Sequence, residues 1–131
     1  MTYRVRPWLS ATGISVLFVT FVFLACSDPG GQGNGCQSTG ADVTINAQNN
    51  LTFDKPTLTV TLGQRVCWQN FGSVTHTVTS DPASPADSTW NLDATLTPNT
   101  VVIHTFTKSG DYPYHCFFHV GSNMRGTIHV P

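Results

Sequence analysis

From Ala41 to the C-terminus, apolar and polar residues alternate along short runs of the chain. Apolar residues recur at every second position in the runs Val43–Ile45, Leu58–Leu62, Val66–Trp68 and Val101–Ile103. Pairs such as Asn-Asn, Lys-Pro and Ser-Gly separate these runs, and alternation of this kind indicates β-strands with one buried face. No stretch of ten or more residues has convincing helical periodicity. The pattern therefore predicts an all-β domain over residues 41–131, with about seven short strands packed as a two-sheet sandwich.

Two segments refine this prediction. Residues 81–97 are mixed in polarity and contain proline, which predicts a long connection with room for one turn of helix. The sequence Gly110-Asp111-Tyr112 lies shortly before Cys116 and resembles the tyrosine corner of Greek-key sandwiches. We therefore expect a Greek-key two-sheet β-sandwich.

The first 25 residues have the pattern of an export signal. Arg4 and Arg6 precede an apolar stretch that is densest over Ile14–Leu24, an order typical of secretory signal peptides. The stretch ends at Phe23-Leu24-Ala25-Cys26, which resembles the lipobox of bacterial lipoproteins, in which the cysteine is lipidated and becomes the mature N-terminus. Residues 26–40 are rich in glycine and predict a flexible tether. Two alternatives remain, namely an uncleaved transmembrane anchor and secretion with cleavage elsewhere.

Composition and charge narrow the classes of function. A length of 131 residues fits a single domain. The chain has 6 basic and 7 acidic residues, and removal of residues 1–25 with their two arginines changes the net charge from −1 to 4 − 7 = −3. A chain with so little positive charge is not expected to bind nucleic acid. Its four cysteines are too few for a disulfide-rich scaffold, and its apolar residues are too dispersed for a multi-span membrane protein.

The C-terminal part of the chain contains candidate metal ligands. Cys116, His119 and Met124 fit within one loop between two predicted strands, and His76 lies at the start of an earlier strand. Two imidazoles and one thiolate in a plane, with a distant thioether on the axis, form a ligand set that holds copper as a one-electron centre. The sequence therefore predicts a copper site formed by these four residues.

This domain resembles a cupredoxin, a blue copper protein of the plastocyanin and pseudoazurin type. The Cys-x2-His-x4-Met spacing is that of this group, whereas amicyanins have a shorter loop and azurins longer ones. Asn70, six residues before His76, fits the family's first-ligand loop. The resemblance implies that His76, Cys116 and His119 are equatorial copper ligands and that Met124 is the axial ligand.

The sequence departs from the family pattern at three positions beside the ligands. Thr77 follows the first histidine, where the family usually has asparagine that ties the two ligand loops together. Phe117 stands where Ser or Thr usually follows the cysteine, and Phe118 stands where Pro often precedes the second histidine. Because such neighbours tune a metal site, the reduction potential is left open.

The remaining cysteines and histidines have other expected roles. With Cys26 lipidated and Cys116 bound to metal, Cys36 and Cys67 are left, and export favours a disulfide between them over two free thiols. His104 and His129 lie in strand patterns and are expected at the surface or rim. His115 alternates with Cys116 and should point to the outer face, away from the copper.

The function that the resemblance implies is one-electron transfer by a blue copper protein outside the cytoplasm. The expected partners are redox proteins that bind transiently, and the membrane is contacted through the N-terminal lipid or an uncleaved helix. We expect a monomer and not an enzyme, because the chain is too short for the second copper centre of copper oxidases. A copper-binding module for storage, delivery or sensing is the alternative, and a metal-free adhesion domain is disfavoured by the complete ligand set. An uncharged patch of Phe118, Val120, Gly121 and Ser122 around His119 is the predicted exit for the electron.

Overall fold

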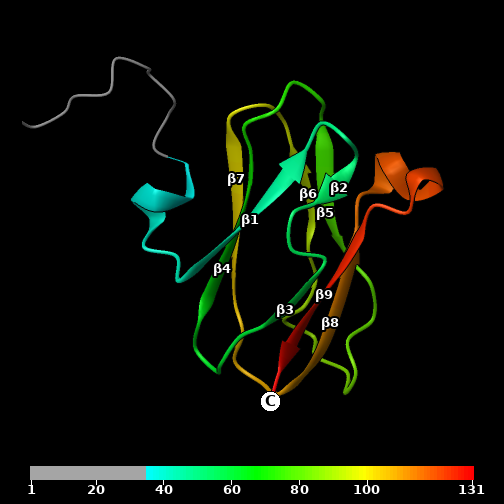
Figure 1. Cartoon of the computed structure of the whole chain (residues 1–131). Coiled ribbons are helices and arrows are strands. Elements are labelled where there is room, and N and C mark those ends of the chain that lie inside the picture. Colours follow the sequence, from blue (N-terminus) through cyan, green and yellow to red (C-terminus); the bar gives the residue numbers. More distant parts are fainter. Residues whose placement is uncertain (1–34) are drawn as a thin grey trace, which may run out of the picture.

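The computed structural model describes residues 35–131, and these residues form a β-sandwich of two sheets (Figure 1). The predicted signal peptide of residues 1–25, the predicted lipidation site Cys26 and the first part of the predicted tether lie outside the described residues. In chain order the elements are η1 (Cys36–Thr39), β1 (Val43–Gln48), β2 (Thr52–Phe53), β3 (Thr57–Thr59), β4 (Arg65–Asn70), β5 (His76–Ser80), β6 (Asp93–Leu96), β7 (Thr100–Thr105), β8 (Gly110–His115), η2 (Phe117–Ser122) and β9 (Arg125–Val130). None of the helices in this part of the chain is long and apolar enough to cross a membrane.

The two sheets have mixed strand directions. One sheet has the order β2-β1-β4-β7 and the other has the order β3-β9-β8-β5-β6. The pairs β1–β4 and β3–β9 are parallel, and the other pairs are antiparallel. The all-β, two-sheet sandwich predicted from the sequence is confirmed.

The core lies between the sheets and follows the alternation of the strands. Ile45, Trp68 and Val102 are neighbours across one sheet, and the first two are fully buried. From the other sheet, Tyr114 packs its ring edge-on against Trp68 at 5.4 Å between ring centroids. Tyr114 also covers Gly126 on β9, where an added Cβ would lie 2.3 Å from the tyrosine Cζ. Glycine is therefore required at position 126, because the ring of its partner on the neighbouring strand occupies the space that a side chain would need.

The segment 81–97 differs from the sequence-based expectation. It contains no helical turn, and Asp93–Leu96 forms the edge strand β6, which pairs with β5 in antiparallel register. Only Leu96 in this strand is fully buried, and the strand has only four residues. Its pattern of apolar and polar residues is therefore too short to distinguish a strand from a loop in the sequence. The strands β2 and β3 are shorter still, which explains why the structure has nine strands among residues 35–131 where about seven were predicted.

A tyrosine corner closes the end of the sandwich where the C-terminus lies (Figure 1). The hydroxyl of Tyr112 lies 2.8 Å from the carbonyl oxygen of Lys108, four residues earlier, and 3.0 Å from Oδ2 of Asp87. The Asp87 carboxylate also accepts hydrogen bonds from the backbone N–H and hydroxyl of Thr89 and from Lys108 Nζ. These bonds hold the pKa of Asp87 well below its usual range, with the Thr89 backbone N–H as the main cause. Burial and the neighbouring carboxylate raise the pKa of Tyr112 to about 12.

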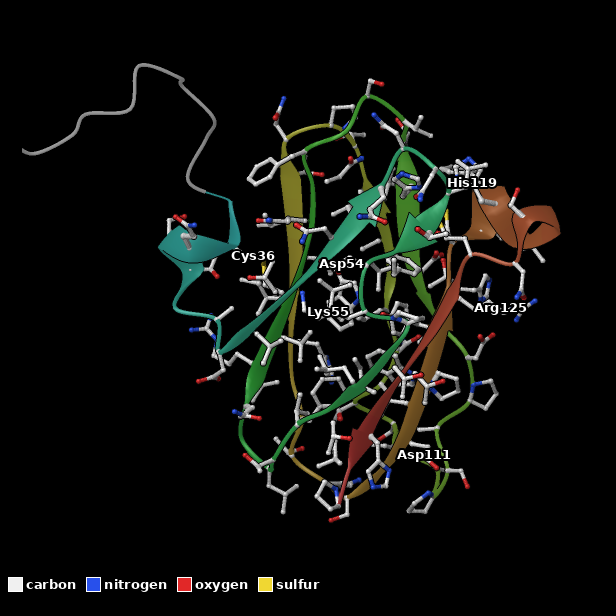
Figure 2. All side chains as sticks on the ribbon, in the orientation of Figure 1. Cys36, Asp54, Lys55, Asp111, His119 and Arg125 are labelled. Atoms are coloured by element: carbon white, nitrogen blue, oxygen red, sulfur yellow. A yellow bond between two sulfur atoms is a disulfide. The ribbon has the colours of Figure 1, made fainter. Side chains whose placement is uncertain are left out.

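A disulfide attaches the start of the described chain to the sandwich. Cys36 and Cys67 are joined with an S–S distance of 2.00 Å, and the backbone N–H of Cys36 donates to Oε1 of Gln69 at 3.0 Å. Cys67 alternates with the core residues Val66 and Trp68, so its side chain lies on the outer face of the sheet, where η1 covers it. Residues 36–39, within the 26–40 segment expected to be a flexible tether, thus form a short 3₁₀ turn (Figures 1 and 2).

Candidate metal centre

Three side chains with metal-binding atoms converge at the other end of the sandwich. His76 begins β5, Cys116 directly follows β8, and His119 lies in η2 (Figure 2). The Nδ1 atoms of the two histidines are 3.2 Å apart. Cys116 Sγ lies 3.2 Å from Nδ1 of His119 and 3.9 Å from Nδ1 of His76. Within residues 35–131, these three residues are the cluster of His, Cys, Asp and Glu side chains with spacing suited to a metal ion.

The loop before β5 places His76 in the buried interior. The side-chain amide of Asn70 donates hydrogen bonds to the carbonyl oxygens of Val74 at 2.7 Å and Leu96 at 2.9 Å. Its Oδ1 accepts the backbone N–H of Gly72 at 2.9 Å. Asn70 thereby fixes the turn that carries the chain from β4 to His76, which is fully buried.

Backbone hydrogen bonds hold the second loop, residues 116–124, in one shape. The N–H of Cys116 donates to the carbonyl of Met124 at 2.9 Å, and the N–H of Met124 donates to the carbonyl of His119 at 3.3 Å. The N–H of His119 donates to the carbonyl of Cys116 at 3.1 Å. Asn123 adopts a left-handed conformation with φ of 55°, which asparagine tolerates better than most residues, and turns the chain into β9. The three positions Cys116, His119 and Met124 are thus tied to one another through the main chain.

Met124 is buried next to this cluster. Its side chain is part of the hydrophobic core, and its backbone bonds to both Cys116 and His119. These contacts place the residue beside the three converging atoms. Its role as an axial ligand stays a prediction.

Thr77 connects the two loops where the family pattern has asparagine. Its backbone N–H donates to Cys116 Sγ at 3.2 Å. Its hydroxyl oxygen accepts the backbone N–H of Phe117 at 2.7 Å. A hydroxyl thus makes the connection between the loops for which the family usually has an asparagine, a role for Thr77 that sequence reasoning missed.

Burial and charge favour the neutral, metal-binding form of the first histidine. Burial lowers the pKa of His76, and a positive charge on His119 would lower it further. At neutral pH, the His76 ring is therefore uncharged, and one of its nitrogens has a lone pair available for a metal ion. The buried sulfur of Cys116 lies against both imidazoles, where it can share a cation with them.

The spacing of the three atoms fits a metal ion between them. An ion bonded to nitrogen at about 2.0 Å and to sulfur at about 2.3 Å, with angles near 120°, separates its ligand atoms by about 3.5–3.7 Å. The observed separations of 3.2 to 3.9 Å lie around these values. One thiolate and two imidazoles also match the soft and borderline donors that copper prefers in both oxidation states.

Exposed apolar side chains surround the cluster on the solvent side. Phe117 is 66% exposed, Phe118 is 55% exposed and Val120 is 42% exposed. The sequence indicated Phe118 and Val120 for this patch but not Phe117. A strand continuing past Cys116 would alternate these side chains between its two faces, whereas the 3₁₀ turn η2 exposes both phenylalanines.

The other histidines lie away from the cluster. Nδ1 of His115 lies 3.0 Å from Oδ1 of Asp81, and His129 contacts Asp111 at 2.7 Å. His104 packs edge-on against Trp90 and Phe106, and burial lowers its pKa. Their positions leave His76 and His119 as the two imidazoles near Cys116.

Comparison with known proteins gives consistent matches. Residues 40–131 match the family model of copper binding proteins of the plastocyanin/azurin family. The chain is 28% identical over 85 residues to plastocyanin of Scenedesmus fuscus, which covers 61% of this chain and 87% of the plastocyanin. It is similar to the structure of an amicyanin variant in its Cu(I) form, with 25% identity, a TM-score of 0.58, and coverage of 70% of this chain and 83% of that chain. A purple cupredoxin from Nitrosopumilus maritimus has the same fold, with 24% identity, a TM-score of 0.55, and coverage of 69% and 100%.

Proposed function

Because this chain belongs to the plastocyanin/azurin family of copper-binding proteins, we propose that it carries single electrons between redox proteins outside the cytoplasm. Its cofactor is copper, and the proposed ligands are Nδ1 of His76, Sγ of Cys116, Nδ1 of His119 and, on the axis, the thioether of Met124. The observation that carries the proposal is the convergence of three metal-binding atoms within 3.2 to 3.9 Å of one another. When bound, copper supplies a Cu(I)/Cu(II) couple that accepts and donates one electron.

The scaffold supports electron transfer by limiting movement of the ligands. His76 is fixed by the turn that Asn70 stabilises, and Cys116 is bonded through Thr77 and through the backbone of Met124. Since the side chains are held before the metal arrives, a change of oxidation state requires little rearrangement of the protein. This property favours an electron carrier over a storage or delivery protein, whose site must open to release the ion.

The surface around His119 is the proposed exit for the electron. His119 is the partly exposed member of the cluster, and Phe117, Phe118 and Val120 around it are exposed and uncharged. A small apolar contact of this kind suits a partner that binds briefly and dissociates fast. Few charges lie on this patch, so salt should have little effect once the proteins are in contact.

Export and a lipid anchor at Cys26 complete the proposal. The disulfide between Cys36 and Cys67 supports an oxidising compartment, because such bonds are rare in the cytosol. In the Cys26→Ser variant the precursor should stay unprocessed or the protein should be released in soluble form. Fractionation and mass measurement test this, and identical mass and membrane retention for both proteins would favour an uncleaved helix.

Reversible electrochemistry of the copper-loaded protein tests the carrier function. We expect one electron per copper in each direction, and the Met124→Gln variant should bind copper at a lower potential, because an amide oxygen favours the oxidised ion more than a thioether does. An unchanged potential would remove Met124 from the coordination sphere. Copper that is lost on each reduction would instead indicate a storage or delivery protein.

The exit surface is tested by stopped-flow electron exchange with a redox partner. Val120→Asp places a charge in the apolar patch and should slow exchange severalfold while the visible spectrum stays nearly unchanged. His115→Ala is the matched control, because His115 lies on the outer face against Asp81. A larger effect of His115→Ala than of Val120→Asp would move the exit to the His115 face.

A further inference from the structure

A row of hydroxyl groups leads from the copper loop to a surface carboxylate. The hydroxyl of Thr77, which accepts the N–H of Phe117 at 2.7 Å, lies 2.9 Å from the hydroxyl of Thr79. The Thr79 hydroxyl lies 3.4 Å from Oδ1 of Asp93, and Thr79 and Asp93 are directly opposite each other in the β5–β6 register. The row thus begins at the residue after Cys116 and ends on the edge strand β6.

The contact with the carboxylate favours one direction for the hydrogen bond between the two threonine hydroxyls. An ionised carboxylate only accepts, so the hydroxyl of Thr79 must donate its single proton to Asp93. The oxygen of Thr79 is then left to accept from the hydroxyl of Thr77. With its proton committed to Thr79, Thr77 presents a lone pair to the N–H of Phe117, and hydrogen bonds aligned in this way strengthen one another.

We propose that Asp93, acting through Thr79, is a positioning residue that orients Thr77 and thereby holds Cys116 in place. Thr77 is 4% exposed, and its backbone N–H donates to Cys116 Sγ while its hydroxyl binds the next amide of the copper loop. The hydroxyl bond depends on the side-chain orientation of Thr77, and it holds the amide that directly follows Cys116. The effect on the metal rests on the proposed copper function, whereas the effect on the loop does not.

The neighbours of Thr79 do not compete for the hydrogen bond between the hydroxyls of Thr77 and Thr79. His115 is the register partner of Thr79 on β8, and its Nδ1 is engaged by Asp81 at 3.0 Å. Thr95, the register partner of Thr77 on β6, lies on the same face of the ribbon and is exposed. Thr95 therefore provides a matched control for the loss of a threonine hydroxyl.

The first measurement is hydrogen–deuterium exchange of the Phe117 amide by NMR in the full chain, loaded with diamagnetic Cu(I) and again without metal. Thr79→Val removes the hydroxyl and keeps the shape and strand preference of the side chain. We expect exchange of the Phe117 amide to accelerate by up to about fivefold, because Thr79→Val weakens the bond from Phe117 to Thr77 without removing its acceptor, and loss of one whole hydrogen bond corresponds to about fivefold. Asp93→Ala should have an effect in the same direction, Thr79→Ser should restore slow exchange, and Thr95→Val should leave it unchanged.

The second measurement is the reduction potential of the copper-loaded variants. When the loop at Phe117 is held less firmly, Cys116 Sγ can move away from the backbone N–H of Thr77, and a thiolate with a weaker hydrogen bond is a stronger donor that favours Cu(II). Thr79→Val should therefore lower the potential, while Thr79→Ser and Thr95→Val should keep it. Unchanged Phe117 exchange in Thr79→Val, or equal acceleration in Thr95→Val, would overturn the proposal. Failure to bind copper in all variants would count against the proposed function alone, because the exchange experiment on the metal-free chain would still decide the role of Asp93.

Discussion

The two ends of the sandwich both hold clusters of polar side chains, but the clusters differ in how their atoms are partnered. One region, which we call the corner end, consists of Asp87, Trp90, Lys108 and Tyr112, and in it hydrogen-bond donors are paired with acceptors. The Trp90 indole N–H donates to the carbonyls of Asp81 and Pro113. The Asp87 carboxylate accepts four hydrogen bonds. At the metal end, comprising His76, Cys116 and His119, the Nδ1 and Sγ atoms face one another.

This difference separates structural from functional polar groups. A buried cluster whose donors and acceptors match stabilises the fold and has no capacity left for a ligand. A buried cluster of lone pairs aimed at one point is costly until a cation occupies that point. Mutations at the corner end should therefore change stability and leave the copper spectrum intact, whereas mutations at the metal end should do the reverse.

The largest effect on stability is expected for Trp90→Ala. Trp90 is 5% exposed and its ring packs against Trp68, His104, Phe106 and Tyr112. Loss of this ring should reduce the free energy of unfolding by about 3–5 kcal/mol. Urea denaturation measures the loss, with the exposed Leu62→Ala as the control, and the visible spectrum of the folded, copper-loaded variant should be unchanged. An altered spectrum would show that the two ends are coupled through the core.

A similar loss of stability is expected when the disulfide is removed. Cys36 and Cys67 are 31 residues apart, and a cross-link of that span stabilises by about 3.5 kcal/mol through the unfolded state. The double variant Cys36→Ser/Cys67→Ser should lose this amount and still bind copper with an intense visible band. If that band disappeared, the metal end would depend on the attachment of η1 and the contrast between the regions would be weaker.

A smaller effect concerns acid stability at the corner end. Folding lowers the pKa of Asp87, so the folded state binds this proton less tightly than the unfolded chain, in which the pKa of aspartate is about 3.9. The stabilisation by Asp87 is thus complete above about pH 4 and is lost as the pH falls further. Asp87→Asn should be less stable at pH 7 and should show a shallower decrease below pH 4 in denaturation experiments. Equal slopes for the two proteins would indicate that other carboxylates dominate.

The sequence was sufficient to predict the sandwich and the residues of the metal end. Alternating strands have a period that is visible in sequence, and Cys116, His119 and Met124 lie within one short loop whose spacing is itself the signal. The turn with Asn70 likewise places His76 by local spacing.

The connections between these elements were not predictable in the same way. The bond from Phe117 N–H to Thr77, and the further contacts to Thr79 and Asp93, join residues that only strand register brings together. A threonine is common in strands for its shape alone, so its hydroxyl carries no signal in the sequence. The strand β6 was missed for a related reason. It is identified by its hydrogen bonds to β5, whereas its own alternation of apolar and polar residues is too short to predict a strand.

The proposed copper site consists of Nδ1 of His76, Sγ of Cys116 and Nδ1 of His119, which bind one ion. Titration of the full chain with Cu(II), followed by visible absorption, tests it most directly when the Cys116→Ser variant is measured in parallel. We expect an intense thiolate-to-copper band that saturates at one equivalent in the unaltered protein. In Cys116→Ser the band should be absent while circular dichroism shows an intact β-sandwich. Equal colour in the two proteins would contradict the claim, because the thiolate of Cys116 would then not be a ligand.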